Sequence, residues 1–540
     1  MLRLTGGAVL AGAFMPHLCL AETREQKSPG VVSGDVDGQK AGAKVLADGG
    51  NAIDAVIAAA LVTCVTSNNR CGIGGYGGHM TIAPAGGKKI TCIDYNSAAP
   101  ASARPDMFPL DEKSNVIDRV NFTGWLAAGV PGTLAGMQLA LDRFGTRSFR
   151  ELATPAIALA RDGFPANRTL AEASSANAAL LRKCQASAKL FLKDNEPLKE
   201  GELFRNPELA QTLAALAERN SVDSFYRGDI AQGIAADFKK HGGLVTEKDL
   251  AEYRAREVSP LELEWNGFTI YTAPLTAGGI TVLQALKILK SMDWSAQPAG
   301  LPKSHARLEA LRAAWRDRLA LLGDPAKVEV PMQRLLSSNY ARSEAELVAQ
   351  AVKEKRPLRF DTNPAGGSGT MHLSAVDARG NMVSMTLTHG AAFGSSVTVE
   401  GLGIVLGHGM SRFNARPGHP NSVGPGKRPL HNMCPTIVTK RNRPVLAIGG
   451  AGGRYIPNSI FDVLINYVAL GRTMEEALRA PRLSSEGDMN LLAENNWPAE
   501  ELEFYKSMGY QPKSVPPGAL AHVSAVSFDP RNGECKGTLR

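Results

Sequence analysis

Residues 361–376, DTNPAGGSGTMHLSAV, decide the fold of this chain. The first nine of them, 361–369, are turn formers and glycines, which hold neither a helix nor a central strand, so they predict a loop. Residues 371–376 have the pattern of a β-strand, and after a short turn residues 382–388 have the same pattern. The sequence therefore predicts a β-hairpin with Thr370 at the start of its first strand.

A glycine loop ahead of a strand-borne threonine suits one type of catalysis. A hydroxyl is a poor nucleophile at neutral pH and needs a base within hydrogen-bond reach. If the chain is cut before Thr370, the new α-amino group, with a pKa of about 8, can take the hydroxyl proton. The precursor can make this cut itself when the same hydroxyl attacks the preceding carbonyl. Such loops are mostly structural, however, so spacing alone leaves both interpretations open.

The N-terminal part of the chain predicts helices and then strands. Apolar residues recur at helical spacing over 39–65 and are interrupted by Gly49-Gly50, which indicates two helices, the second capped by Asn51 or Asp54. The segments expected after them are a glycine loop at 72–78 and strands at 80–82 and 89–95.

The middle of the chain predicts mainly helices, and the last third predicts an α/β arrangement. The clearest helical patterns between 131 and 350 lie at 131–144, 149–162 and 308–322. The last third has strand patterns at 436–439, 444–448 and 523–528 and a helical pattern at 456–470. There is no internal repeat and no apolar run of the length that a membrane helix needs.

Composition excludes several classes of protein. With 540 residues and 44% hydrophobic content the chain is globular. Its 60 Lys and Arg against 52 Asp and Glu give +8, but no run of five basic residues occurs, so a nucleic-acid partner is not expected. Six cysteines follow residue 21 without CxxC or close histidine spacing, which indicates no zinc site; if any pair bridges, Cys64 with Cys71 is the nearest candidate.

The first residues have the order of a signal peptide. A short positive start at residues 1–3 precedes an apolar stretch around 8–15, and small residues lead up to Ala21. The sequence therefore predicts a signal peptide at 1–21 and an exported protein, periplasmic or secreted, without stable membrane insertion. The alternative is a buried first helix.

Several motifs in one order resemble the γ-glutamyltranspeptidases, which belong to the N-terminal-nucleophile hydrolases. The stretch beginning at Thr370 is similar to the start of their small subunit. The other similar motifs are GGNAIDA at 49–55, GIGG at 72–75, VPGT at 130–133, GDP at 323–325, KRPL at 427–430 and PTIV at 435–438. They cover nearly all of the chain after residue 21.

The resemblance implies a mixed α/β fold, the four-layer αββα sandwich. It also implies one folding unit that is cut between Gly369 and Thr370 into a large subunit, 22–369, and a small subunit, 370–540. A small-molecule amide or γ-glutamyl compound would be the substrate. No metal or organic cofactor is implied.

Four catalytic roles carry over from the family. Thr370 would attack the amide carbonyl and hold the acyl group as an ester, and Thr388 would support it through its hydroxyl. Gly452 and Gly453, within GGAGG at 449–453, would line the oxyanion hole with backbone N–H groups. Because no Lys-Ser or Lys-Thr follows this motif, a phosphate-binding loop is not indicated. His372 and His389 are expected to be structural.

The residues expected to hold the γ-glutamyl group depart from the family. Asn96 replaces the arginine that grips the α-carboxylate, and Arg412 replaces the aspartate that pairs with the α-ammonium. The other departures are Gly390 for an asparagine, Gly409 for a glutamine, and His431-Asn432 for two serines. The substrate-binding candidates of this chain are therefore Asn96, Gly390, Arg412, His431 and Asn432.

Three hypotheses follow from these residues. The first is a self-processing amidohydrolase or acyltransferase that acts on γ-glutamyl compounds such as glutathione and passes the acyl group to water or an amine. The second is an acylase of the same family with a different substrate, such as a small anionic amide like oxamate, whose carboxylate Arg412 would bind. The third is a non-catalytic binding homologue, which the retained Thr370 argues against.

Overall fold

The computed structural model describes residues 29–360 and 370–540. The predicted signal peptide at 1–21 and the predicted loop at 361–369, with the cleavage residue Gly369, lie outside the described residues. Thr370 and everything after it are described.

Two six-stranded sheets form the centre of the molecule. The first has the order β1 (Gly30–Ser33), β11 (Met371–Asp377), β12 (Met382–Thr388), β2 (Gly77–Ala83), β3 (Thr91–Asp94) and β8 (Arg256–Val258). The second has the order β21 (Glu534–Leu539), β20 (His522–Asp529), β16 (Arg443–Ala451), β15 (Thr436–Lys440), β10 (Phe268–Thr272) and β9 (Leu261–Trp265). The predicted hairpin, β11 with β12, lies inside the first sheet.

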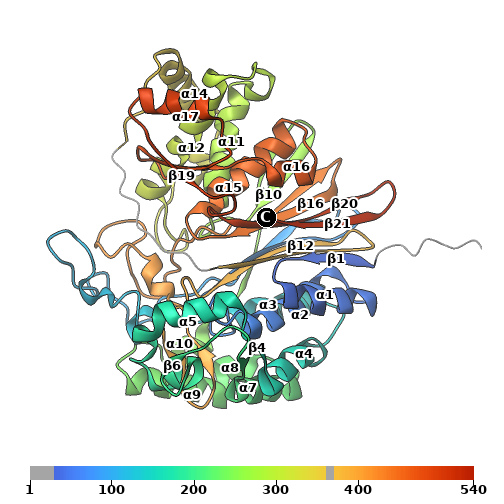
Figure 1. The fold of residues 1–540 in the computed structure, drawn as a ribbon, viewed down its shortest axis with the longest axis vertical. Helices are drawn as coiled ribbons and strands as arrows, with labels where there is room; N and C mark the ends of the chain where they lie inside the picture. Colours follow the sequence, from blue (N-terminus) through green and yellow to red (C-terminus); the bar gives the residue numbers. More distant parts are fainter. Residues whose placement is uncertain (1–28, 361–369) are drawn as a thin grey trace, which may run out of the picture.

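The two sheets pack face to face, with helices on both outer faces (Figure 1). Small and branched side chains of both sheets meet between them, among them Ala83, Val376, Ile437 and Val526. The first sheet is covered by α1 (Val36–Ala47), α2 (Ala52–Thr66), α3 (Thr133–Phe144) and α4 (Phe149–Asp162). The second is covered by α11 (Gly279–Ser291), α12 (Leu301–Leu321), α14 (Ser338–Lys353) and α15 (Tyr455–Leu464). The layers are thus helix, sheet, sheet and helix.

Helix α2 shows why the sequence favours this layering. Every one of its residues is buried, which matches its apolar run over residues 55–62, since a helix that is apolar all round belongs in a core. Its start is fixed by Asn51 and Asp54 together. The Asn51 side chain accepts from the backbone N–H of Asp54, and the Asp54 carboxylate accepts from the backbone N–H of Asn51.

The remaining helices and short strands lie at the two ends of the molecule. These helices include α5 (Arg168–Leu181), α7 (Pro207–Arg219), α9 (Asp229–Lys240), α16 (Met474–Arg479) and α17 (Ala499–Ser507). A separate three-stranded sheet contains β17 (Leu483–Ser484), β18 (Asn490–Glu494) and β19 (Gln511–Val515).

The structure differs from the predicted elements in two boundaries and in two further strand features. The helix expected at 308–322 begins at Leu301, and the strand expected from residue 89 begins at Thr91. The strand at 523–528 is not the last, because β21 pairs with it at the edge of the second sheet. The region predicted as helical contains the hairpin of β9 and β10, whose Asn266-Gly267 turn is a hairpin signal.

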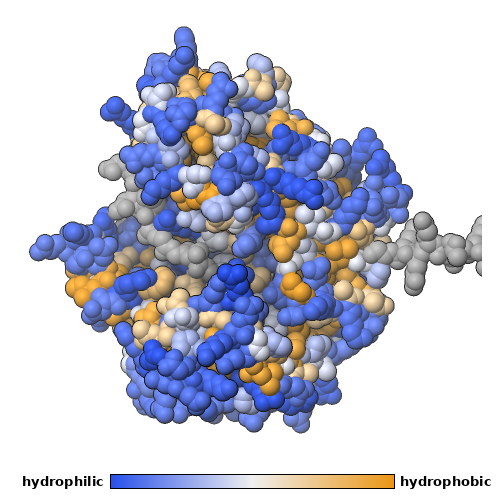
Figure 2. Space-filling view, in the orientation of Figure 1, coloured by the Kyte–Doolittle hydropathy of each residue, from blue (hydrophilic) through white to orange (hydrophobic). Residues whose placement is uncertain are grey.

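The surface is polar, with scattered apolar side chains on the face shown in Figure 2. Among residues 29–360 and 370–540, no helix combines the length and the apolar character needed to cross a bilayer. Cys64 and Cys71 are both buried free thiols, so the candidate disulfide between them is absent.

Candidate active site

Thr370 and Thr388 face each other at one end of the central hairpin. Met371 pairs with Leu387 in the antiparallel register of β11 and β12, which places the next two residues, Thr370 and Thr388, side by side. Their Oγ1 atoms are 3.2 Å apart. Thr388 Oγ1 also accepts from the backbone N–H of Gly390 at 2.7 Å. The register of the hairpin thus brings together two residues that are eighteen positions apart.

A small pocket lies over Thr370. It has a volume of about 10 Å³, room for about one water molecule. Its lining residues are Tyr76, Thr370, Arg412, Asn432, Met433, Gly453 and Ile456. Thr370 directly precedes β11 of the first sheet, whereas Gly453 lies in the connection between β16 and α15 over the second sheet and Ile456 in the first turn of α15. The pocket therefore lies where the two sheets meet, and none of its described lining residues is acidic.

Gly452 and Gly453 connect β16 to α15 in a conformation that favours glycine. Their φ angles are +152° and +59°, and a Cβ atom on Gly452 would lie 2.7 Å from the carbonyl oxygen of Leu520. Gly453 lines the pocket directly. The second sheet thus presents backbone toward the hydroxyl of Thr370.

Arg412 brings a positive charge to the pocket wall. Its Nη2 donates to the carbonyl oxygen of Gly390 at 2.6 Å. Gly390 has φ +99°, and a Cβ atom there would lie 2.1 Å from the ring of His408. The His408 ring therefore occupies the space that an asparagine side chain at position 390 would need. Glycine at position 390 thus leaves room for the His408 ring.

Asn96 ties two loops together and is not among the pocket-lining residues. Its side chain is fully buried, and its Nδ2 donates to Thr276 Oγ1 and to the carbonyl oxygen of Pro429, both at 2.7 Å. Gly409 is equally confined, because a Cβ atom there would lie 2.4 Å from Ser97 Oγ. These two positions shape the neighbourhood of the pocket rather than its lining.

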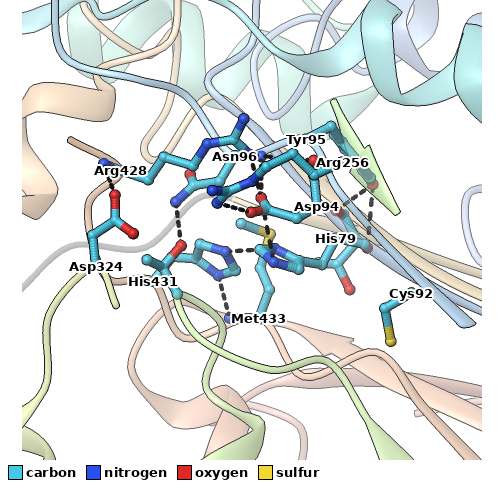
Figure 3. A network of polar contacts seen from close by, with 12 residues as sticks. His79, Cys92, Asp94, Tyr95, Asn96, Arg256, Asp324, Arg428, His431 and Met433 are labelled. Carbon is cyan, nitrogen blue, oxygen red and sulfur yellow. Dashed lines mark hydrogen bonds and ion pairs between the residues drawn. The ribbon is translucent and has the colours of Figure 1, made fainter. Parts of the chain in front are cut away.

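The two residues of the His431-Asn432 pair have different surroundings. Asn432 lines the pocket, and its Oδ1 accepts from Arg318 Nη2 at 2.9 Å. His431 is 1% exposed, and its Nε2 lies 2.9 Å from Nδ1 of His79. Figure 3 shows His431 in a buried polar network with His79, Asp94, Arg256 and Arg428.

His372 and His389 lie in the core near the site. The ring nitrogens of His372 lie within hydrogen-bond distance of Thr386 Oγ1, at 2.7 Å, and Ser374 Oγ, at 3.0 Å. Burial lowers the pKa of both His372 and His389 to about 3, so both rings are neutral at physiological pH. Neither lines the pocket.

Sequence reasoning did not single out several residues at the site. Tyr76, Met433 and Ile456 line the pocket, and Arg318 orients Asn432. Tyr76 interrupts the glycine loop at 72–78, which is a signal that a larger side chain is needed there. No sequence feature singles out Arg318, because charged residues are common on helices.

Two packed sheets with a threonine pocket at their junction are the architecture of an amidohydrolase of known type. The chain belongs to the γ-glutamyltranspeptidase family, whose profile matches residues 38–538. It is 36% identical over 502 residues to the glutathione hydrolase proenzyme of Escherichia coli, a match that covers 90% of this chain and 83% of that protein.

Two further relatives carry acylase names. The chain is 31% identical to the acylase ACY 1 proenzyme of Pseudomonas sp. (strain V22), over 91% of this chain and 88% of that protein. The crystal structure of cephalosporin acylase from Bacillus halodurans superposes with a TM-score of 0.84 at 27% identity, and the match covers 98% of this chain and 99% of that one. The chain is thus an amidohydrolase of a family that includes glutathione hydrolases and acylases.

The described residues contain no group of three or more His, Cys, Asp or Glu side chains placed to hold a metal ion.

Proposed function

We propose that this chain is a precursor that cuts itself between Gly369 and Thr370 and then cleaves amides with Thr370 as the nucleophile. The observation that carries the proposal is the position of Thr370, with its Oγ1 3.2 Å from Thr388 Oγ1 in a pocket that Gly453 also lines. The names of the relatives support it, because the glutathione hydrolase and the acylase are both called proenzymes.

The reactants of the proposed cut are the Thr370 hydroxyl, the Gly369 carbonyl and water. Thr370 Oγ attacks the carbonyl carbon of Gly369, and the C–N bond breaks as the hydroxyl proton passes to the departing amide nitrogen. The result is an ester between Gly369 and the Thr370 side chain. Water hydrolyses this ester, which leaves a carboxylate on Gly369 and a free α-amino group on Thr370. The two products are the large subunit, 22–369, and the small subunit, 370–540.

Turnover repeats this chemistry on a substrate amide. The α-amino group of Thr370 takes the hydroxyl proton, and Oγ attacks the substrate carbonyl. Thr388 holds the nucleophile in place through the contact between the two hydroxyls. The amine leaves with a proton, and water or an acceptor amine then releases the acyl group from Thr370.

Gly452 and Gly453 would stabilise the oxyanion through their backbone N–H groups. We expect Gly452→Ala to lower the rate of acyl-enzyme formation by about 10²-fold to 10³-fold. The reason is that the new Cβ would lie 2.7 Å from the Leu520 carbonyl oxygen, so the backbone must shift. Stopped-flow acylation with an acyl p-nitroanilide measures this rate.

The matched control is Gly471→Ala. Gly471 also has a positive φ, +67°, but a Cβ atom there would meet nothing within 4 Å. We expect this variant to acylate at a rate within about twofold of the wild type, as exposed substitutions usually do. Equal rates for both glycine variants would contradict the proposed oxyanion role of Gly452.

The charges that line the pocket indicate which acyl group the substrate carries. A γ-glutamyl group carries an α-ammonium, which needs a negative partner, yet none of the described lining residues is acidic and Arg412 is positive. These contacts favour an acyl group other than γ-glutamyl, such as that of a small anionic amide. The relatives named acylases support this second candidate; γ-glutamyl compounds are the default of the family.

A panel of γ-glutamyl, oxamoyl and longer acyl p-nitroanilides distinguishes the two candidates. We expect the wild type to turn over γ-glutamyl p-nitroanilide more slowly than at least one other member. We expect Arg412→Asp to raise γ-glutamyl turnover by at least about tenfold, or about 1.4 kcal/mol, because it replaces a repulsive positive charge with an attractive negative one. Arg416→Asp, an exposed change in the same loop, serves as the control. Rapid γ-glutamyl turnover by the wild type would contradict the altered specificity.

Trapping the acyl-enzyme tests the nucleophile itself. The protein is quenched in acid during steady-state turnover, and its fragments are weighed by mass spectrometry. We expect the added acyl mass on the fragment 370–540 and, after digestion, on Thr370. Turnover with acyl mass on another residue would overturn the proposal. A chain that is neither cut nor acylated would favour the non-catalytic homologue.

Export is the other part of the proposal. The signal peptide at 1–21 would place the enzyme in the periplasm or outside the cell.

A further inference from the structure

A chain of polar contacts leads from the buried Arg428 and the partly exposed Arg256 to the wall of the pocket (Figure 3). Asp94, at the end of β3, lies between Arg428 Nη1 at 2.7 Å and Arg256 Nη2 at 2.6 Å. His79 Nε2, on β2, lies 3.4 Å from Asp94 Oδ1, and His431 Nε2 lies 2.9 Å from His79 Nδ1. These contacts connect the first sheet to the segment that precedes β15.

The last contact in the chain reaches a residue that lines the pocket. The backbone N–H of Met433 donates to His431 Nδ1 at 3.3 Å, and Met433 lines the pocket with Thr370. Asn432, between the two, lines it as well. The ring of His431 therefore contacts the pocket wall from behind.

The contacts determine where each imidazole carries its hydrogen. A backbone N–H can only donate, so His431 Nδ1 must be unprotonated and the hydrogen of the neutral ring is on Nε2. That N–H points to His79 Nδ1, which must then be the acceptor. The hydrogen of His79 is therefore on Nε2 and faces the Asp94 carboxylate. The distance from His79 Nε2 to Asp94 Oδ1 is 3.4 Å, an electrostatic contact without a hydrogen bond. No other pair of neutral tautomers satisfies the contacts that join Met433, His431 and His79.

Burial keeps both rings neutral. It lowers the pKa of His79 to about 4, and it lowers the pKa of His431 well below the usual value, with the neighbouring His79 adding to the effect. Burial alone would raise the pKa of Asp94, but His79, Arg428 and Arg256 together lower it further, so Asp94 is a carboxylate. The direction of the chain is thus set by the backbone N–H of Met433, which can only donate.

The segment 428–433 is also held at its start, by contacts that do not involve the histidines. The carbonyl oxygen of Pro429 accepts from Asn96, and the backbone N–H of Arg428 donates to Asp324 at 2.9 Å. Residues 428–430 are thereby fixed without the histidines. The following residues, 431–433, which reach the pocket, are held through backbone contacts with Thr276, Gly278 and Arg318. What the histidine chain adds is a side-chain contact to the backbone N–H of Met433.

We infer that His431 and His79 are positioning residues, which help to set the place of Asn432 and Met433 in the acyl pocket through the contact of the Met433 N–H with His431 and the contact of His431 with His79. This inference rests on the proposed role of Thr370 beside that pocket. His431 therefore shapes the binding of the acyl group without touching the substrate. It also gives a physical reason for histidine at position 431, because serine is too short to reach a second ring.

A double-mutant cycle tests the inference. His431→Phe, His79→Phe and the double variant are assayed on the panel p-nitroanilide that the wild type turns over fastest. Each single change is expected to raise KM about fivefold to tenfold with kcat within about threefold, because binding is lost equally in the ground state and the transition state. The double variant is expected to match the single ones, because either change breaks the same chain. His241→Phe, an exposed change, should leave both constants unaltered.

The outcomes separate this inference from the proposed function. KM values within twofold of the wild type, or additive effects in the double variant, would overturn the positioning role. A collapse of kcat at constant KM would do the same and would place His431 at the reacting atoms. Intact mass shows in each variant whether the cut before Thr370 occurs, so a failure of the nucleophile proposal is recognised separately.

A spectroscopic measurement covers the case in which the variants do not fold or no panel member is hydrolysed. The wild-type protein, labelled with ¹⁵N at the histidine rings, is expected to show His79 and His431 as neutral rings protonated at Nε2 between pH 8 and pH 6. A proton on Nδ1 of either ring would overturn the inference.

Discussion

Replacing Thr370 with alanine is expected to abolish both the cut and the amidase activity. The variant lacks the hydroxyl that attacks in each reaction, so the chain should remain one piece and kcat/KM should fall by at least about 10³-fold. Its fold should persist, because the Thr370 side chain makes only the contact to Thr388 among its described hydrogen bonds. Gel electrophoresis and intact mass show whether the chain is cut, and the p-nitroanilide assay measures kcat/KM.

The control for this prediction is Thr370→Ser. Serine keeps the hydroxyl and loses only a methyl group, so we expect it to cut, more slowly than the wild type, and to retain measurable turnover. If Thr370→Ala were cut and active, or if the serine variant behaved like the alanine variant, Thr370 would not be the nucleophile.

Mild acid is expected to destabilise the folded chain strongly. Burial lowers the pKa of His79 to about 4 and that of His372 and His389 to about 3, and it lowers the pKa of His408 and His431 well below normal. In the unfolded chain the same rings have a pKa of about 6.5. As the pH falls below this value the unfolded state gains protons that the folded state does not, so stability is lost with falling pH. Each of the three rings with a pKa of about 3 or 4 contributes about 2 kcal/mol between pH 7 and pH 5.

Summed over these three rings, the expected loss is about 6 kcal/mol, which is comparable to the whole stability of a typical protein. Glu486 acts in the opposite direction, because burial raises its pKa to about 7 and it gains stability as the pH falls, offsetting about one histidine. Urea unfolding of the uncut Thr370→Ala chain at pH 7, 6 and 5 measures the effect without complication from two fragments. An unchanged free energy of unfolding over this range would contradict the burial of these neutral rings.

Local pattern was enough to predict the hairpin at the centre of the candidate site. Residues 371–376 and 382–388 have strand patterns around a tight turn, and the register of that hairpin brings Thr370 to Thr388. The roles of Thr370, Thr388 and the glycine pair at 452–453 came from the resemblance to a family and not from the pattern. A pattern records neighbours in sequence, which is enough for a hairpin but not for a catalytic role.

Other parts of the site depend on contacts between distant segments, which no local pattern contains. His79 and His431 are 352 positions apart and meet only because β2 and the segment before β15 lie at the junction of the two sheets. Asn96 illustrates the same limit. Its place in a motif indicated a substrate contact, whereas its side chain is held by Thr276 and the Pro429 carbonyl.

The measurement that tests the central claim most directly is the intact mass and N-terminal sequence of the purified wild-type protein. We predict two fragments, the smaller of which begins with Thr370 and has the mass of residues 370–540. A single uncut chain, or a small fragment that begins at any other residue, would contradict the proposal that Thr370 is an N-terminal nucleophile.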